Sequence, residues 1–252
     1  MAWAVAASTG VFEMLSMPAR TYRCNASPDS TDWPPMVEVA TVNVGVPQVL
    51  IEQDHQRIYS AIAKQPVADG TVLWLSLYNL AGDGQADLSV HGGPDKAVYS
   101  YPSEHLPAWV AELDEPLGPA PFGENLSTVG VLESDVNIGD VWQWGDAYLQ
   151  ICQPRSPCFK LALHRQQADI QKRLRGNGRT GWYLRVLEPG EVVVGAPIDV
   201  VRRDPAALTV ADAHLAMSDR HLVDRPRVEA LAAHPALAIE WRQPLIDRLA
   251  IR

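Results

Sequence analysis

The chain has 252 residues, a formal net charge of −9 at pH 7 and an apolar fraction of 47%. This length suits one large domain or a domain with a small appendage, and the apolar fraction excludes a disordered chain. The acidic balance argues against nucleic-acid binding, and no apolar run reaches the length that spans a membrane.

The cysteine content bounds the redox environment. Three cysteines, Cys24, Cys152 and Cys158, are too few for a disulfide framework or for an iron–sulfur cluster with four thiolates. Their small number indicates a reducing compartment, so we expect a cytoplasmic protein.

The N-terminal stretch shows no secondary-structure period. It starts with the apolar run Ala2–Val5, which lacks the basic n-region of a signal peptide, and it ends in Trp33-Pro34-Pro35. Met36 stands directly before the first strand-like segment. We therefore predict that residues 1–36 are a disordered or mis-annotated extension, with a short ordered arm as the alternative.

Residues 37–203 consist of short apolar segments separated by glycine, proline and aspartate. A helix is expected from Ser103, as N-cap, to Leu113, and another from Leu161 to about Leu174. The pattern predicts strands over 37–46, 72–77, 97–101, 126–131, 141–144, 148–153, 182–187, 192–194 and 198–201, with 182–187 and 192–194 joined as a hairpin. Many short strands and few helices favour a mainly β fold with some α, built as a β-barrel.

The composition changes after residue 203. From Thr209 to the end there is no glycine, and the apolar spacing is helical. We expect helices over 209–217, 225–233 and 236–249, so residues 204–252 are predicted to form a small appended three-helix domain.

One cysteine lies in an unusual local sequence. The run Gln153-Pro154-Arg155-Ser156-Pro157-Cys158 holds a thiol in a stiff, positively charged turn after a strand-like segment. Arg155 and a helix start at Phe159 would favour the thiolate, which is a nucleophile and a soft metal ligand. A buried structural thiol is the alternative, because free cysteine is among the most buried residue types. The turn alone leaves both open.

A second candidate is the turn within residues 87–99. Gly92 and Gly93 allow successive backbone N–H groups to converge on an anion, and His91 and Lys96 flank them with further donors. This composition suits a phosphate or another acidic group. A hairpin turn with a surface lysine is the alternative interpretation.

Two further polar residues lie in glycine-containing loops. Asn125 offers two donors and an acceptor for reading a heterocycle edge, although a loop asparagine more often satisfies its own backbone. Arg179, framed by Gly178 and Gly181, is preorganised for a planar anionic group, with a solvated loop arginine as the alternative. P-loop and Gly-x-Ser-x-Gly spacings are absent, and the histidines show no recognised zinc interval.

Taken together, the motifs resemble MOSC-domain proteins, a family named for the C-terminal domain of molybdenum-cofactor sulfurases. In particular they resemble the bacterial branch linked to resistance to 6-hydroxylaminopurine, whose small C-terminal 3-alpha domain is similar to residues 209–252. The motifs, in family order, are His-Gly-Gly-Pro-Asp-Lys-Ala-Val-Tyr (91–99), Phe-Gly-Glu-Asn-Leu (122–126), Gln-Pro-Arg-x-Pro-Cys-x-Lys-Leu (153–161) and Gly-Arg-Thr-Gly-Trp-Tyr-Leu-Arg-Val-Leu (178–187).

The resemblance implies a fold and a cofactor. It implies a MOSC β-barrel of the pyruvate kinase insert-domain type over 37–203 and a 3-alpha helical domain over 204–252. It also implies the molybdenum cofactor, a molybdopterin with a phosphate tail, with Cys158 as molybdenum ligand or as a carrier of transferred sulfur. The residues expected to hold the pterin and its phosphate are His91, Gly92, Gly93, Lys96, Asn125, Arg155 and Arg179.

The function expected from the resemblance is a molybdenum-dependent reductase of N-hydroxylated compounds, such as hydroxylaminopurines or amidoximes. Cys158 and His91 are its expected catalytic residues. Electrons would come from a separate flavoprotein or ferredoxin-type donor, and the helical domain would dock that donor, cap the barrel or form a homodimer. Three alternatives stay open: a sulfur or cofactor carrier without reductase activity, a pyridoxal phosphate protein with a Schiff base at Lys96, and a structural protein.

Overall fold

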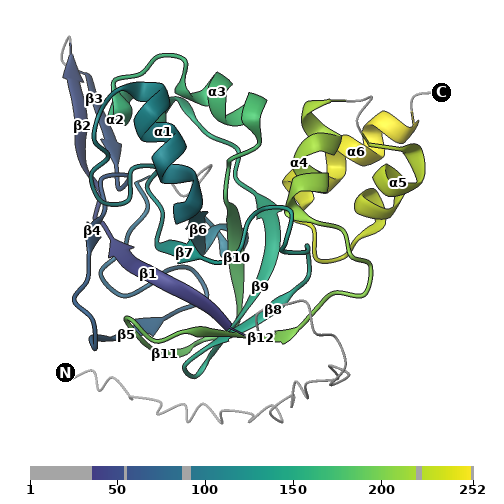
Figure 1. Cartoon of the computed structure of the whole chain (residues 1–252), viewed down its shortest axis with the longest axis horizontal. Coiled ribbons are helices and arrows are strands. Elements are labelled where there is room, and N and C mark those ends of the chain that lie inside the picture. Colours follow the sequence, from purple (N-terminus) through teal and green to yellow (C-terminus); the bar gives the residue numbers. More distant parts are fainter. Residues whose placement is uncertain (1–35, 54–55, 87–91, 220–222, 251–252) are drawn as a thin grey trace, which may run out of the picture.

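The computed structural model describes residues 36–53, 56–86, 92–219 and 223–250 (Figure 1). In this part of the chain a seven-stranded barrel forms the centre, in the order β12-β8-β9-β10-β6-β7-β1, and pairing of β12 with β1 closes it. Closure leaves no unpaired edge in the ring. The strands are β1 (Met36–Val44), β6 (Val98–Pro102), β7 (Leu126–Val129), β8 (Val141–Trp144), β9 (Ala147–Pro154), β10 (Trp182–Glu188) and β12 (Ile198–Arg202). The predicted mainly β fold with a barrel is confirmed.

The first strand shows how the sequence specifies the barrel interior. Val37 and Val39 face the core, as period-two alternation requires. A shift of register against β7 between Val39 and Thr41 then changes the phase, so that Val42 also points inward. Only Met36 of the predicted extension 1–36 lies among the described residues, and it belongs to β1.

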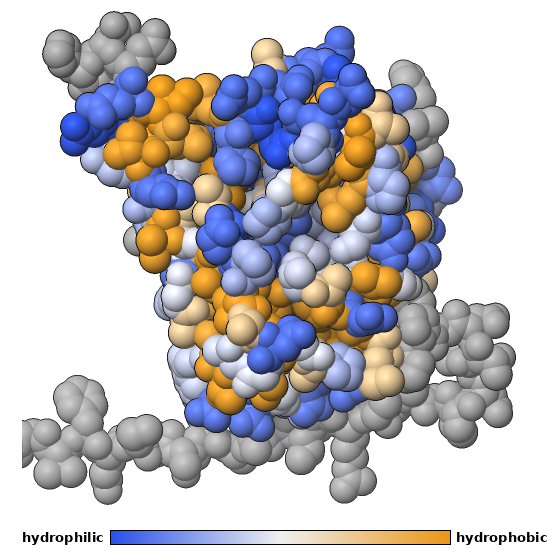
Figure 2. All heavy atoms as spheres, turned by 60° about the vertical axis from the view of Figure 1, so that its left-hand side comes forward, coloured by the Kyte–Doolittle hydropathy of each residue, from blue (hydrophilic) through white to orange (hydrophobic). Residues whose placement is uncertain are grey.

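Two smaller sheets and one short strand flank the barrel. They are the hairpin β2 (Gln48–Gln53) and β3 (Gln56–Ser60), the strand β4 (Gln65–Pro66) beside β1, and the pair β5 (Val72–Leu75) and β11 (Gly190–Val193). None of β2, β3 and β4 was expected. The prediction that β11 pairs with β10 is wrong, because β6 and β9 occupy both edges of β10 and β11 pairs with β5 instead. On the side that carries the β2–β3 hairpin, apolar patches lie among hydrophilic side chains (Figure 2).

Short helices cover one end of the barrel (Figure 1). They are the helices α1 (Leu106–Leu113), α2 (Phe159–Arg165) and α3 (Ile170–Asn177), while the 3-10 turns η1 (Pro94–Lys96) and η2 (Ser103–His105) precede β6 and α1. The single helix predicted for 161–174 is wrong: Gln166 takes a left-handed conformation, φ 53°, which ends α2. Ser103 is also not the N-cap expected, since it starts a 3-10 turn without a side-chain cap bond.

Three helices follow the barrel as predicted: α4 (Val210–Ser218), α5 (Arg225–Ala233) and α6 (Ile239–Ala250), here called the helical unit. Thr209 and Asp212 form a capping box at the start of α4. One hydrophobic cluster includes Leu149 and Ile151 of the barrel as well as residues of α4 to α6. The boundary at 203/204 stays a prediction. In the described part of the chain, no helix combines the length and apolarity that crossing a membrane requires.

Candidate functional site

Cys158 lies where the barrel meets the helices. Strand β9 ends at Pro154, and Cys158 is the extended residue directly before α2, with φ −103° and ψ 169°. Its side chain is half-buried, whereas Arg155, three residues earlier, is buried with 6% exposure. The stiff turn predicted from the prolines thus presents the thiol at an accessible position and places a cation in the protein beneath it.

Two cavities meet at this cysteine. An inner chamber of about 100 Å³ lies at the mouth of the barrel, and an outer cavity of about 920 Å³ lies between the barrel, α3 and the helical unit. Both are lined by Lys96, Arg155, Cys158 and Tyr183. A group bound in either cavity therefore contacts the same thiol and the same cations.

Arg155 is fixed by aromatic neighbours. Its guanidinium carbon lies 4.5 Å from the centre of the Tyr99 ring, and its Nη1 donates to the Tyr99 hydroxyl at 3.1 Å. Burial alone would lower the pKa of Arg155, but the Tyr99 and Tyr183 phenols and the Cys158 thiol together raise it. The site therefore contains a permanent, preorganised positive charge facing the cysteine.

Two tyrosines lie beside Arg155: Tyr99 is buried with 3% exposure, and Tyr183 is half-buried. The rings of Tyr99 and Tyr183 lie 5.2 Å apart, and the Tyr99 hydroxyl donates to the carbonyl of Thr180 at 2.8 Å. Burial raises the pKa of both phenols, partly opposed by the charge of Arg155. Both hydroxyls are therefore neutral near pH 7 and can act as hydrogen-bond donors.

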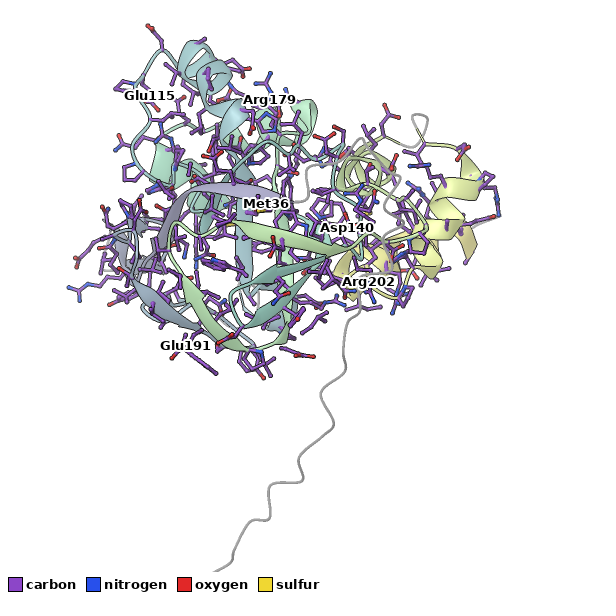
Figure 3. All side chains as sticks on the ribbon, turned by 60° about the horizontal axis from the view of Figure 1, so that its bottom comes forward. Met36, Glu115, Asp140, Arg179, Glu191 and Arg202 are labelled. Carbon is purple, nitrogen blue, oxygen red and sulfur yellow. The ribbon has the colours of Figure 1, made fainter. Side chains whose placement is uncertain are left out.

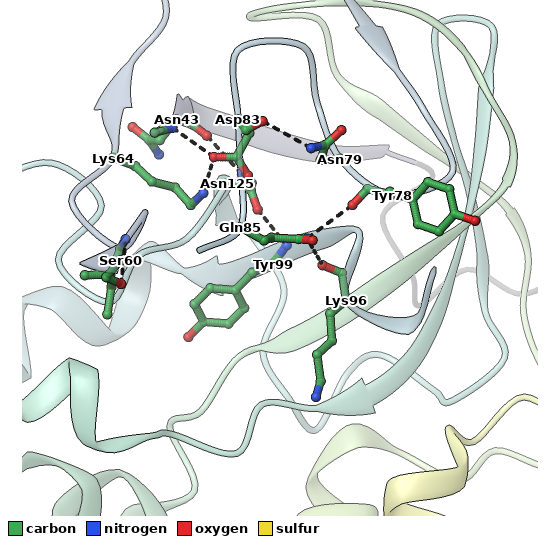
Figure 4. Close-up of polar contacts among 12 residues, drawn as sticks. Asn43, Ser60, Lys64, Tyr78, Asn79, Asp83, Gln85, Lys96, Tyr99 and Asn125 are labelled. Carbon is green, nitrogen blue, oxygen red and sulfur yellow. Dashed lines mark hydrogen bonds and ion pairs between the residues drawn. The ribbon is translucent and has the colours of Figure 1, made fainter. Parts of the chain in front are cut away.

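The inner chamber ends in a buried ion pair between Lys64 and Asp83 (Figure 4). Asp83 Oδ1 also accepts from the backbone N–H of Gly45 at 2.8 Å, and Oδ2 accepts from Asn125 Nδ2 at 2.9 Å. Burial lowers the pKa of Lys64, while the charge of Asp83 opposes that change. This end of the chamber is polar and internally satisfied, which suits a small polar group rather than an apolar one.

Asn125 lines the inner chamber, but protein groups engage its amide. Oδ1 accepts from Tyr99 N at 3.1 Å, and Nδ2 donates to Asn43 O at 3.1 Å as well as to Asp83. These bonds tie β6, β1 and the Asp83 loop together. Both amide hydrogens are used, so the geometry fits a structural role, and ligand binding by Asn125 stays a prediction.

The charged residues that line the outer cavity are mostly cations. Helix α3 contributes Lys172 and Arg175, in addition to the cations shared with the inner chamber. The helical unit contributes Glu240, whose carboxylate pairs with Lys96 Nζ at 2.7 Å. Lys96 extends from the barrel side toward the helical unit, seen at the lower edge of Figure 4. The pair thus bridges the two parts of the molecule at the junction of the cavities.

The structure brings together some of the predicted site residues and separates others. Cys158, Arg155 and Lys96 converge as expected. Gly92 and Gly93 line a neighbouring recess of about 160 Å³ that includes Lys96 and Glu240. His91 lies outside the described residues.

Arg179 does not line either cavity at Cys158. Its Nη1 pairs with Glu112 at 2.6 Å, its guanidinium lies 5.8 Å from the Trp109 ring, and it borders a separate cavity of about 520 Å³. Figure 3 shows Arg179 and Glu115 on the side of the barrel that carries the helices, away from Glu191. Its expected role at the pterin is therefore not supported by its position.

Several lining residues were missed in the sequence. Tyr99 and Tyr183 lie inside the quoted motifs, but aromatic residues in strands usually pack in the core, so neither carries a local signal of a site residue. Arg175 and Lys172 belong to a basic run on one short helix, which was a usable signal. Lys64, Asp83 and Glu240 carry no local signal, because each reaches the site from a distant part of the chain.

The family model for the MOSC domain matches residues 87–199. The uncharacterized protein YflK of Bacillus subtilis is 40% identical over 210 residues, which is 83% of this chain and 93% of YflK. The chain belongs to the MOSC-domain family. The predicted family is thereby confirmed.

The chain is also similar to YiiM proteins, both in sequence and in structure. Escherichia coli YiiM is 40% identical over 193 residues, 75% of this chain and 84% of YiiM. The crystal structure of YiiM from Geobacillus stearothermophilus has a TM-score of 0.70 at 32% identity and covers 85% of this chain and all of that one. A protein of Gibberella moniliformis named "Reductase" is 39% identical over 152 residues, 58% of this chain but only 26% of that protein.

MOSC domains are associated with the molybdenum cofactor, and the residues present fit that group. Lys96, Arg155, Lys172 and Arg175 surround a cavity whose volume suits a pterin-sized anion. Among the described residues, no group of three or more His, Cys, Asp or Glu side chains is placed to hold a metal ion. The described residues would therefore offer molybdenum one soft ligand, the sulfur of Cys158.

Proposed function

We propose that this protein binds the molybdenum cofactor and reduces N-hydroxylated compounds of the hydroxylaminopurine or amidoxime type. One observation carries the proposal: the Cys158 thiol lies at the junction of a small polar chamber and a large cationic cavity. This arrangement places one sulfur and one buried cation within reach of groups bound in either cavity.

Different residues of the chain would bind the metal and the anionic groups of the cofactor. Cys158 would supply a sulfur ligand, and Arg155, Lys96, Lys172 and Arg175 would hold anionic groups by charge-assisted hydrogen bonds. When bound, the cofactor supplies the two-electron redox chemistry. Tyr99, which is buried, and Tyr183, which is half-buried, border the barrel side of the site and keep neutral hydroxyl groups there.

The reaction balances with one external partner. An N–OH group, two electrons and two protons give N–H and water, so the N–O bond breaks and the substrate is reduced. The electrons would come from a separate flavoprotein or ferredoxin-type donor. A Gly-x-Gly-x-x-Gly spacing occurs at 176–181, but it begins in the last turn of α3 and precedes β10, the reverse of the strand-to-helix order of a dinucleotide site. His91 remains the predicted proton shuttle.

The test is a comparison of cysteine variants produced in a host that makes molybdopterin. Molybdenum and pterin contents are measured in wild type, Cys158→Ser and the matched control Cys152→Ser. Cys152 is a buried thiol of β9 that contacts the Asp95 and Tyr183 carbonyls, and burial raises its pKa to about 12. We expect loss of molybdenum only in Cys158→Ser. Loading that is equal in all three proteins would contradict the role of Cys158.

The loaded protein is then assayed for loss of 6-hydroxylaminopurine with a chemical reductant. Turnover by wild type but not by Cys158→Ser supports the reductase. Full cofactor loading without turnover of this compound or of an amidoxime overturns the reductase and favours a cofactor carrier, which needs the cysteine but no substrate space.

A further inference from the structure

The outer cavity contains one charge of the wrong sign for an anionic ligand. Glu240 is the one acidic residue among the described residues that line it. The charged residues around it are Lys96, Arg155, Lys172 and Arg175. A carboxylate would weaken the binding of anionic groups by charge repulsion. Holding a cofactor therefore does not account for Glu240.

The position of Glu240 is set by the barrel as well as by its own helix. The residue before α6, Ala238, donates its backbone N–H to the carbonyl of Cys152 in β9 at 2.9 Å. Strand β9 leads directly to the turn that carries Cys158. Together with the ion pair to Lys96, this contact fixes the carboxylate relative to the Cys158 thiol. The Glu240 side chain is still 44% exposed, so a ligand can reach it.

Aromatic side chains line the same cavity as this carboxylate, although Trp241 is largely buried, with 6% exposure. Trp241, the next residue, and Tyr183 of the barrel both line the cavity. A carboxylate next to aromatic surfaces matches a flat group that carries N–H donors and positive charge.

We propose that Glu240 and Trp241 form a subsite for the N–H-rich edge of a planar amidine or amino-substituted heterocycle. This inference rests on the proposed function in that such an edge belongs to the substrates and products named there. Lys96 engages Oε2 of Glu240, and a carboxylate can accept about four hydrogen bonds. Oε1 can therefore accept from an amidinium while the ion pair persists. The helical unit would in this way select the substrate.

The test is equilibrium binding by calorimetry, using the full chain without cofactor. Benzamidine is the charged probe, and benzamide is its neutral analogue of nearly the same shape. The variant Glu240→Gln keeps the shape and a hydrogen bond to Lys96. The control is Glu229→Gln in α5, an exposed residue paired with Arg225 and absent from the cavity lining. Thermal unfolding of each variant shows whether the fold is retained.

We expect wild type and Glu229→Gln to prefer benzamidine over benzamide, and Glu240→Gln to lose about tenfold in benzamidine affinity with no change for benzamide. An unchanged preference in Glu240→Gln, an equal loss for both probes, or no benzamidine binding by wild type would overturn the subsite. Because the measurement needs neither cofactor nor turnover, a failed reductase assay leaves it valid. Reductase activity with equal benzamidine binding in all variants would reject the subsite alone.

Discussion

The guanidinium of Arg155 stacks on the ring of Tyr99 and donates to the hydroxyl of the same residue, at 4.5 Å and 3.1 Å respectively. That hydroxyl in turn donates to the carbonyl of Thr180. The tyrosine thus serves as both platform and acceptor for the cation. Because Arg155 also borders both cavities, its contacts with Tyr99 fix the position of the positive charge that an anionic ligand at Cys158 would contact.

Replacing this arginine tests that charge. In Arg155→Lys the charge stays but the planar fork and the stacking are lost, so we expect partial cofactor loading. In Arg155→Met we expect molybdenum and pterin contents at least about tenfold below wild type. The control is Arg225→Met, which removes an exposed arginine of α5. Wild-type loading of Arg155→Met, in a protein that unfolds cooperatively, would contradict the role given to this cation.

The buried pair Lys64–Asp83 predicts a strong coupling in stability. The two side chains are 7% and 4% exposed, so Asp83→Asn leaves a buried ammonium without its counter-charge. We expect a loss of about 3 kcal/mol in unfolding free energy for Asp83→Asn. The double variant with Lys64→Met should lose less than the sum of the single variants. Urea denaturation of the four proteins measures this, and additive losses would show that the pair is not coupled.

The sequence was sufficient for the elements whose signals are local. The alternating valines of 37–44 and the helical spacing after Thr209 predicted β1 and the helices α4 to α6 within a few residues. Pairing was harder. The Pro189-Gly190 turn favours a hairpin by local rules, but β10 already has a neighbour on each edge. The break at Gln166 also had no glycine or proline to mark it.

The site likewise contains residues that local motifs predict and residues that only tertiary packing brings in. Arg155 and Cys158 lie in one turn, and Lys96 lies in a second motif, so their convergence followed from recognising the motifs together. Glu240 approaches from α6 through the packing of the helical unit on the barrel. No short-range pattern encodes that contact. Arg179 illustrates the converse, because its motif was visible but its side chain turns to Glu112.

Glu124 predicts a defined pH dependence of stability. The side chain is fully buried, and burial raises its pKa from 4.5 to about 7, against opposing hydrogen bonds from backbone N–H groups. The folded state therefore binds this proton more tightly than the unfolded state. The contribution of the protonated Glu124 to the free energy of unfolding is complete below pH 4.5 and is lost as the pH rises to about 7. The loss is on the order of 3 kcal/mol.

The variant Glu124→Gln isolates this effect. It keeps the shape and can still bond Phe122 N and Ser127 Oγ, which contact the carboxylate at 3.0 and 3.3 Å. We expect the difference in unfolding free energy between wild type and variant to change across that pH range in favour of the variant. Urea denaturation at both ends of the range measures it. A difference that is independent of pH would show that Glu124 does not titrate there.

Two glycines of the loop before β10 provide a matched pair for backbone strain. Gly178 and Gly181 both have positive φ, 73° and 64°. A Cβ on Gly178 would meet only His214, at 3.6 Å, so Gly178→Ala should cost about 1 kcal/mol for the left-handed backbone alone. A Cβ on Gly181 would overlap the carbonyl oxygen of Ser100 in the barrel wall. Because that atom is backbone in β6, it cannot move aside without disturbing the pairing of β6 with β10.

We therefore expect Gly181→Ala to be destabilised by at least about 3 kcal/mol, well beyond Gly178→Ala. Thermal and urea unfolding of the two variants measure the difference. Because Gly181 also accepts from Arg155 N at 3.1 Å, displacement of this residue should disturb the buried cation as well. A cofactor content reduced in Gly181→Ala but normal in Gly178→Ala would link the loop to the site. Equal stabilities would show that the β6 wall yields to the added methyl group.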